Sequence, residues 1–412
     1  MSETRPEIRS TWDRLAWVFI AAGSALRVLW PLDMEWKYDE KWMFAAALRI
    51  ARGQDAWPWV GMPSGVSLRN PGLSIWPFAL LARGSADPVV MAQAIQWLNV
   101  LGLWGLAAWV VRTWPRADRS LGLWSVALFA VSPLAVLFSR KIWAQDLLIV
   151  LLVPWLWAQR KRTTFAGAAL WGVFGALLGQ LHMSGFFAAA ALVFATLAFD
   201  RRSFPWLPWL LGSIVGALPL IPWLLAVLGD AGPGVATGAS LPTWHFFPHA
   251  LRHAFGLGLE YPLGRDYRVF LRGPDAACVH THLNAAARYG LLALLAAGVI
   301  QQLVRRRKQR TWHLPEPVKL YGLTALLMGF LLKTARVHVF AHYLIVLGPI
   351  FHIVAVWLLF PQRAVVLAAC TLQAFLSLNF LWFVHTHDGA PEADYGPSYR
   401  AQTAEERALP LQ

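Results

Sequence analysis

Apolar residues along this chain fall into runs of about 20 residues, separated by shorter polar connections. A run of about 20 apolar residues is long enough to cross the hydrocarbon core of a bilayer as a helix. The pattern therefore predicts an all-α polytopic membrane protein with about eleven transmembrane helices in a single domain. The predicted spans cover residues 12–32, 89–111, 121–138, 142–158, 165–181, 185–199, 206–228, 283–304, 318–332, 342–360 and 364–384.

Basic residues mark every second connection between these runs. Cytoplasmic loops of membrane proteins carry an excess of Lys and Arg, so this alternation orients the chain with its N-terminus in the cytoplasm. Three longer segments then lie outside, at residues 33–87, 229–282 and 385–412. The basic clusters are Arg5, Arg9 and Arg14, then Arg112, Arg116 and Arg119, Arg160 to Arg162, Arg201 and Arg202, Arg305 to Lys308, and Arg363.

The first external segment carries two further helical patterns. Over residues 39–52, Met43, Ala47 and Ile50 recur at helical spacing, which predicts an amphipathic helix lying in the membrane interface. A second short helix is expected to begin at Asn70-Pro71, since Asn is a good N-cap and Pro suits the first helical position, and to end at Gly84. It is too short to span.

Composition agrees with this class and excludes others. The chain is 57% hydrophobic and 14% charged, against roughly 25% charged residues in soluble domains. Its formal charge of +14 resides in clusters between apolar runs, so we expect no nucleic-acid partner. The first run lacks a small-residue cleavage site and reads as part of the mature chain. Cys278 and Cys370 are expected to form neither a disulfide nor a metal site.

Polar residues from several connections collect at the predicted outer face. A polar side chain at the membrane surface is costly unless it is paired or faces a water-filled cavity. We therefore expect one shared polar cavity there. The residues concerned are Asp39, Glu40, Arg69, Asn70, Arg140, Lys141, Gln145, Asp146, Gln180, His182, Lys333, Arg336, His338, His342 and Tyr343.

Each of these residues also has a purely structural interpretation. Asp39 and Glu40 could simply begin a helix, because acidic residues favour helix N-termini. Asp146 could form an ion pair with Arg140 or Lys141, and His182 could be a hydrogen-bonded core residue.

The external arginines and histidines also allow more than one interpretation. Arg69 and Arg336 could be interfacial arginines whose charged ends reach water. External cations beside a carboxylate also suit an anionic lipid head group, which Arg can grip through two hydrogen bonds. Histidines of the second external segment and its flank could suggest a metal, but no acidic or cysteine framework accompanies them, so no metal site is predicted. They are His245, His249, His253, His280 and His282.

Several short motifs resemble the GT-C membrane glycosyltransferases, and most closely family 39, which holds protein O-mannosyltransferases and lipid A aminoarabinose transferases. The external Asp-Glu pair directly after the first span is the most specific element. The motifs that carry this resemblance are Asp39-Glu40, Arg69-Asn70-Pro71-Gly72-Leu73, Ser139-Arg140 with Asp146, the run from Gln180 to Gly185, the run from His342 to Pro349, and the tail from Asp394 to Arg400.

This resemblance implies a polyprenyl-phosphate sugar donor, inverting transfer and a catalytic carboxylate, with no cofactor or divalent metal. Asp39 would act as general base, with Glu40 and Asp146 also in the catalytic group. The implied donor and phosphate contacts are Arg69, Arg140, Lys141, Arg336, His342 and Tyr343. The implied sugar and acceptor pocket comprises Tyr38, Trp42, Asn70, Gln145 and His182. The implied location is a bacterial inner membrane, with the site facing the periplasm and the acceptor unspecified.

Two other functions remain open from the sequence. Polar sites in membranes also serve transport, so a lipid-linked glycan flippase is one alternative. Transporters often contain paired repeats and broken central helices, whereas here no repeat is visible and the polar residues gather at one face. An oligosaccharide ligase or polymerase of the same broad class is the other alternative.

Overall fold

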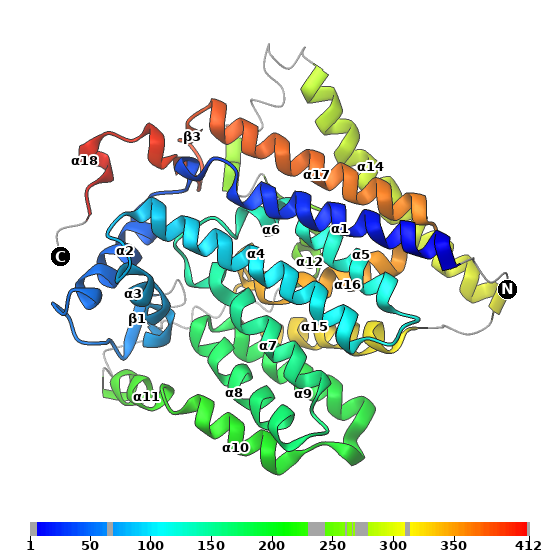
Figure 1. Ribbon diagram of the computed structural model, residues 1–412, viewed down its shortest axis with the longest axis horizontal. Coiled ribbons are helices and arrows are strands. Elements are labelled where there is room, and N and C mark those ends of the chain that lie inside the picture. The colour runs from blue at the N-terminus through cyan, green and yellow to red at the C-terminus, as the bar shows by residue number, and fades with distance from the viewer. Residues whose placement is uncertain are drawn as a thin grey trace.

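The structure is a computed structural model that describes residues 6–63, 69–229, 244–259, 262–265, 267, 279–309 and 314–409. It is a bundle of helices with two very small sheets, which confirms the predicted all-α class (Figure 1). Five helical segments are long and apolar enough to cross a membrane, or six if one bent pair counts as a span. The chain is therefore a multi-pass membrane protein. The five are α4 (Pro88–Thr113), α9 with the adjoining η4 (Ser184–Ser203), the Leu283–Arg307 part of α14, η6 with α16 (Ala341–Leu359), and α17 (Arg363–Thr386).

The other predicted spans are helical but shorter, broken or more charged. The run at 206–228 forms α10 (Trp206–Ala217) and α11 (Leu220–Gly229), which meet at a bend of 58°. Length and apolarity therefore support fewer single-helix spans than the eleven predicted. The remaining elements are α1 (Pro6–Val28), α5 (Arg119–Ala130), α6 (Pro133–Leu137), η3 (Ala144–Leu147), α7 (Leu148–Arg160), α8 (Phe165–Leu181), α14 (Val279–Gln309), α15 (Glu316–Thr334), η6 (Ala341–Leu347) and α16 (Gly348–Leu359).

One break has a clear cause in the sequence. The predicted span at 121–138 ends as α5 at Ala130, and α6 begins at Pro133. Proline has no backbone N–H, and it disfavours helical geometry at the residue before it, so it begins a new helix more easily than it continues one. Ser132, which precedes it, has an extended backbone conformation.

The first external segment differs from the sequence expectation in two ways. Helix α2 (Tyr38–Ala51) forms as predicted, but its apolar rows are buried against protein, chiefly α3 (Trp76–Ala82), and not against lipid. The predicted helix start at Asn70-Pro71 is wrong. These residues belong to strand β2 (Arg69–Pro71), paired antiparallel with β1 (Val60–Pro63), where the Asn70 amide donates to the Met62 carbonyl at 3.0 Å. A single turn, η2 (Gly72–Ser74), links β2 to α3.

The C-terminal residues return to this same segment. After α17, they form β3 (Gly389–Ala390), β4 (Gly396–Pro397), η7 (Tyr399–Ala401) and α18 (Ala404–Arg407), and Ser398 forms an antiparallel bridge with Glu35. Figure 1 shows α18 and β3 at the end of the molecule where α2 and α3 lie, with the N-terminus at the opposite end. Residues 35 and 398 are thus brought together from the two ends of the chain.

The second external segment is only partly described. Helix α12 (Phe246–Ala254) packs on α16 and includes His249 and the buried His253. Cys278 and the side chains of His280 and His282 lie outside the described residues. Cys370 is a buried free thiol on α17.

Candidate functional site

Asp39 and Glu40, at the start of α2, have different roles: Glu40 caps the helix and Asp39 lines a cavity. Glu40 is fully buried, and its Oε2 accepts a hydrogen bond from the Lys37 backbone N–H at 3.3 Å, in a capping box with Lys37 as N-cap. Asp39 is half-buried and lines a cavity. The helix-start interpretation therefore describes Glu40, while Asp39 is one of the residues that line the cavity.

This cavity, hereafter the polar pocket, has a volume of about 520 Å³. It gathers polar groups from segments that are distant in the sequence, as the sequence predicted. Six predicted site residues line it together, which are Asp39, Asn70, Gln145, His182, His342 and Tyr343. Residues that the sequence analysis did not assign to the site also line it, including Lys37, Met43, Trp143, Ser184, Phe340 and Asp394.

Aromatic rings form one wall of the polar pocket. The His342 ring lies 5.2 Å from Trp143 and 4.8 Å from Tyr343, centroid to centroid, and is stacked nearly parallel to Phe340 at 5.5 Å. The His182 ring is 5.4 Å from Tyr343. Its Nδ1 lies 2.7 Å from the Ser184 hydroxyl, so His182 is a buried, hydrogen-bonded residue that also lines the pocket. Such a wall offers flat apolar surface with polar edges.

A buried ionic cluster lies behind Asp39. The Glu35 carboxylate is fully buried and contacts two ammonium groups, those of Lys37 at 2.7 Å and of the buried Lys141. Lys37 in turn reaches the pocket and lies 3.0 Å from the Asp394 carboxylate. The cation that faces the pocket is therefore Lys37, while Lys141 is held in the interior.

This environment shifts the titration of the α2 carboxyls. Burial raises the pKa of Asp39, although the nearby Lys37, Trp143 and Lys141 side chains partly oppose it. Burial, with the Glu35 charge, raises the pKa of Glu40 to about 8. Burial lowers the pKa of Lys37, but Glu35, Asp394 and Glu40 outweigh it, so the net direction is upward and the ammonium stays charged.

The Ser139–Asp146 motif is divided between the polar pocket and the protein interior, with Trp143 and Gln145 lining the pocket. Arg140 is buried and donates to the backbone carbonyls of Arg27 and Trp30, each at 2.9 Å. The Asp146 carboxylate accepts from the Lys141 backbone N–H at 2.9 Å. Arg140, Lys141 and Asp146 therefore do not line the pocket. The alternative ion pair of Asp146 with Arg140 or Lys141 is not formed either, since Lys141 pairs with Glu35.

Four other predicted site residues also lie outside the pocket lining, namely Tyr38 and Trp42 on α2 and the external residues Arg69 and Arg336. On α2, Asp39 and Met43 are one turn apart and face the pocket, whereas Tyr38 and Trp42 form the neighbouring row. Residues four apart share one helix face, and adjacent residues point about 100° apart. Tyr38 is 69% exposed, and Trp42 packs partly buried against the core.

The predicted external arginines are both exposed. The Arg69 side chain is not among those that line the pocket, and its backbone carbonyl accepts from the Trp223 indole at 2.9 Å. Arg336 has a positive φ of 56° directly after α15, next to Val337, which does line the pocket. Its side chain is not among those that line the cavity.

The described histidines do not form a metal site. His245, His249 and His338 approach one another with ring centroids 6.1–6.4 Å apart. Among the residues that the structure describes, no group of three or more His, Cys, Asp or Glu side chains is arranged to hold a metal ion.

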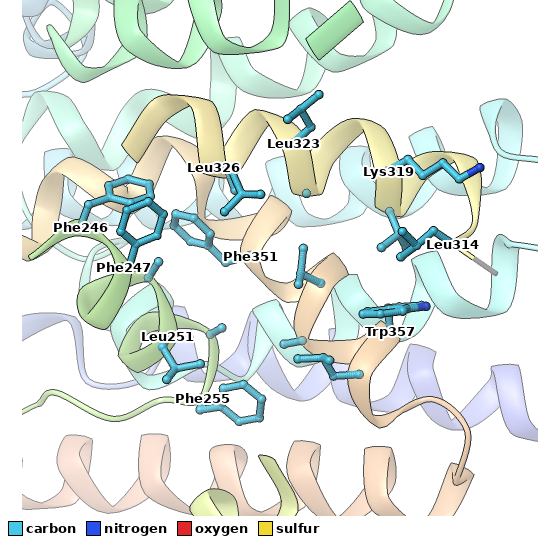
Figure 2. A pocket seen from close by; sticks show the side chains of 18 of the residues that line it. Phe246, Phe247, Leu251, Phe255, Leu314, Lys319, Leu323, Leu326, Phe351 and Trp357 are labelled. Carbon is cyan, nitrogen blue, oxygen red and sulfur yellow. The ribbon is translucent and has the colours of Figure 1, made fainter. Parts of the chain in front are cut away.

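A second cavity, hereafter the apolar groove, runs along α15. Its volume is about 590 Å³, and it lies between α12, α15 and α16 (Figure 2). Figure 2 shows Phe246 and Phe247 near one end, with Lys319, Leu314 and Trp357 at the other. Lys319 is its one charged lining residue. The sequence does not indicate this groove, because its lining residues are of the same types as those of an ordinary membrane span.

Comparisons with known proteins give one structural match. No family model and no curated protein matches the sequence. The structure is similar to ArnT from Cupriavidus metallidurans, whose crystal structure was determined with undecaprenyl phosphate bound, at a TM-score of 0.49 and 15% sequence identity. The match covers 84% of this chain and 60% of the ArnT chain. ArnT is a GT-C lipid A aminoarabinose transferase, which is the class that the sequence motifs resemble. A likeness at 15% sequence identity is one of fold.

Proposed function

We propose that the protein is a glycosyltransferase that moves a sugar from a polyprenyl-phosphate donor to an acceptor at the outer face of the membrane. The observation that carries this proposal is the half-buried Asp39 carboxylate in a polar pocket that also contains the Lys37 ammonium and an aromatic wall. A base, a cation and a stacking surface are the groups that this reaction needs.

In the proposed step, the acceptor hydroxyl oxygen attacks the anomeric carbon of the donor sugar. The bond between that carbon and the phosphate oxygen breaks, polyprenyl phosphate leaves, and the anomeric configuration inverts. Asp39 takes the acceptor proton, as a general base within hydrogen-bond reach can do. Its raised pKa favours this role, because a base works best when its pKa is close to the working pH. Lys37 stabilises the charge on the departing phosphate.

The apolar groove supports a lipid-linked donor. Its lining is almost wholly apolar, which suits an isoprenoid chain. Helix α15 contributes lining residues to both cavities, Leu326 to the apolar groove and Leu332 to the polar pocket. At 1.5 Å per residue these two positions are about 9 Å apart along the helix axis. A donor could therefore place its phosphate near Lys37 and its chain along α15.

The direct test is incubation of the purified protein with a labelled polyprenyl-phosphate sugar and a crude cell-envelope acceptor fraction. The proposal predicts that free polyprenyl phosphate is released and that label moves to the acceptor. If sealed vesicles carry the intact donor across the membrane without release, the protein is a flippase and the proposal is wrong.

Lys37, and not Arg69, is expected to bind the donor phosphate. Lys37→Met should weaken polyprenyl-phosphate binding about tenfold, since a hydrogen bond to a charged group is worth about 1.5–3 kcal/mol. Arg69→Ala should change polyprenyl-phosphate binding less than about twofold, because the Arg69 side chain does not line the pocket. Titration of each variant in detergent measures this. Equal losses in both variants would restore the sequence-based assignment of Arg69.

The outward orientation of the polar pocket can be tested by cysteine labelling in a Cys278→Ser background. Glu405→Cys, on the C-terminal segment, should react with an impermeant thiol reagent added to intact cells. Arg116→Cys, in a basic connection, should not react until the membrane is opened. Both positions are exposed, so accessibility within the protein does not limit labelling. The reverse pattern would place the site in the cytoplasm.

A further inference from the structure

The C-terminal segment, residues 388–409, is anchored on the short stretch that leads into α2. The Tyr399 backbone N–H donates to the Met34 carbonyl at 2.9 Å. The Gln402 side chain donates to the Trp36 carbonyl at 2.7 Å, and the Trp36 indole donates to the Arg407 carbonyl at 3.2 Å. These contacts hold the segment over the entrance to α2 and therefore beside the polar pocket.

From this segment, Asp394 projects into the polar pocket. Its side chain is 46% exposed, and one carboxylate oxygen lies 3.0 Å from the Lys37 ammonium. Asp394 also acts on Asp39, because its negative charge contributes to the raised pKa of that carboxyl. The pocket thus contains a second carboxylate that the proposed chemistry has not used.

Lys37 has two carboxylate partners with different accessibility. Glu35, at 2.7 Å, has a side chain with no exposed surface, so this pair is shielded from solvent. At Asp394 the Lys37 ammonium contacts the carboxylate and also donates to the backbone carbonyl, and both contacts are open to water. The carboxylate contact is an exposed ion pair, and such pairs contribute only about 0–1 kcal/mol because water and salt screen them. An incoming anion can therefore replace Asp394 at Lys37 without disturbing the Glu35 pair.

We propose that Asp394 competes with the donor phosphate for the Lys37 ammonium, so that the C-terminal segment sets donor affinity and promotes release of polyprenyl phosphate after transfer. This inference rests on the proposed function. In the structure the Asp394 carboxylate contacts the Lys37 ammonium. Donor phosphate displaces it, and after transfer the carboxylate returns as the lipid phosphate departs. Asp394 is thus a positioning residue that acts through Lys37.

The test is undecaprenyl-phosphate binding to the full-length protein in detergent. Asp394→Asn removes the competing charge at constant size, so it should tighten binding about two- to fivefold, which corresponds to the worth of an exposed ion pair. If release limits turnover, kcat should fall while KM falls with it. A disrupted segment would instead weaken binding, which separates this effect from simple misfolding.

Two controls isolate the pairwise competition. Glu392→Gln removes one negative charge from the same segment at an exposed position that does not line the pocket, and it should leave affinity unchanged. In a Lys37→Met background, Asp394→Asn should no longer tighten binding, because the shared cation is absent.

Unchanged or weaker binding by Asp394→Asn would overturn the inference, as would equal tightening by Glu392→Gln or tightening that persists without Lys37. These outcomes leave the proposed function intact if the unaltered protein binds undecaprenyl phosphate and transfers sugar. If the unaltered protein neither binds the lipid phosphate nor transfers sugar, the proposed function itself fails.

Discussion

Asp39→Asn is expected to reduce sugar transfer by roughly 10²–10⁴-fold, the usual contribution of a positioned general base. The substitution keeps the size and hydrogen-bonding capacity of the side chain but removes its ability to accept the acceptor proton. Donor binding should stay close to normal, since Lys37 provides the cation that faces the pocket. Transfer rates and polyprenyl-phosphate affinity, measured on the same purified preparation, check both expectations.

The neighbouring residue provides the matched control. Glu40→Gln changes an adjacent carboxyl in the same helix turn, but Glu40 is fully buried and caps α2, so it does not line the pocket. We expect it to reduce transfer far less than Asp39→Asn. Asp39→Glu should also lose most activity, because one extra methylene displaces the base. A fully active Asp39→Asn variant would rule out the mechanism.

Glu35→Gln is expected to destabilise the folded protein by about 3–5 kcal/mol, as removal of one partner of a buried ion pair generally does. Its carboxylate contacts Lys141, whose side chain is only 2% exposed. Without that carboxylate, the Lys141 ammonium stays buried beside a neutral amide. Thermal unfolding in detergent measures the loss. The double variant Glu35→Gln with Lys141→Met should recover much of it, because the unpaired charge is then gone.

An exposed pair provides the comparison for this prediction. Glu316 pairs with Arg160 at 2.8 Å, but its side chain is 55% exposed. Glu316→Gln should therefore cost at most about 1 kcal/mol. If Glu35→Gln costs no more than Glu316→Gln, the ionic cluster behind Asp39 does not stabilise the fold in the way its burial indicates.

The sequence predicted the residues of the site best where backbone topology decides their position. Asp39, Asn70, Gln145, His182, His342 and Tyr343 were expected to meet because each follows or precedes an apolar run at the same face, and they do line one pocket. Their placement at one pocket depends on the spacing of the apolar runs and on the alternation of basic connections, and both can be read from the sequence.

Side-chain direction was not readable in this way. Arg140 was predicted to bind the donor phosphate, but its guanidinium donates to backbone carbonyls in the interior. Tyr38 and Trp42 lie on the correct helix, but on the row next to Asp39 and Met43. Asn70-Pro71 has the residue types of a helix start, but pairing with β1 outweighed that local preference. For Arg140 and Asn70-Pro71, contacts from elsewhere in the chain outweighed local residue preferences, whereas helix geometry alone separates Tyr38 and Trp42 from the row that faces the pocket.

The sequence by itself therefore determined the membrane class, the predominance of helix, and Asp39 as the leading candidate for a pocket-facing carboxylate. Hydrophobic run length and helical periodicity are local properties, so they need no knowledge of distant contacts. Only the tertiary structure placed Glu35 between Lys37 and Lys141, and placed Asp394 in the pocket. Asp394 and Lys37 are 357 residues apart, and no local pattern encodes a contact made when the C-terminal segment folds back over α2.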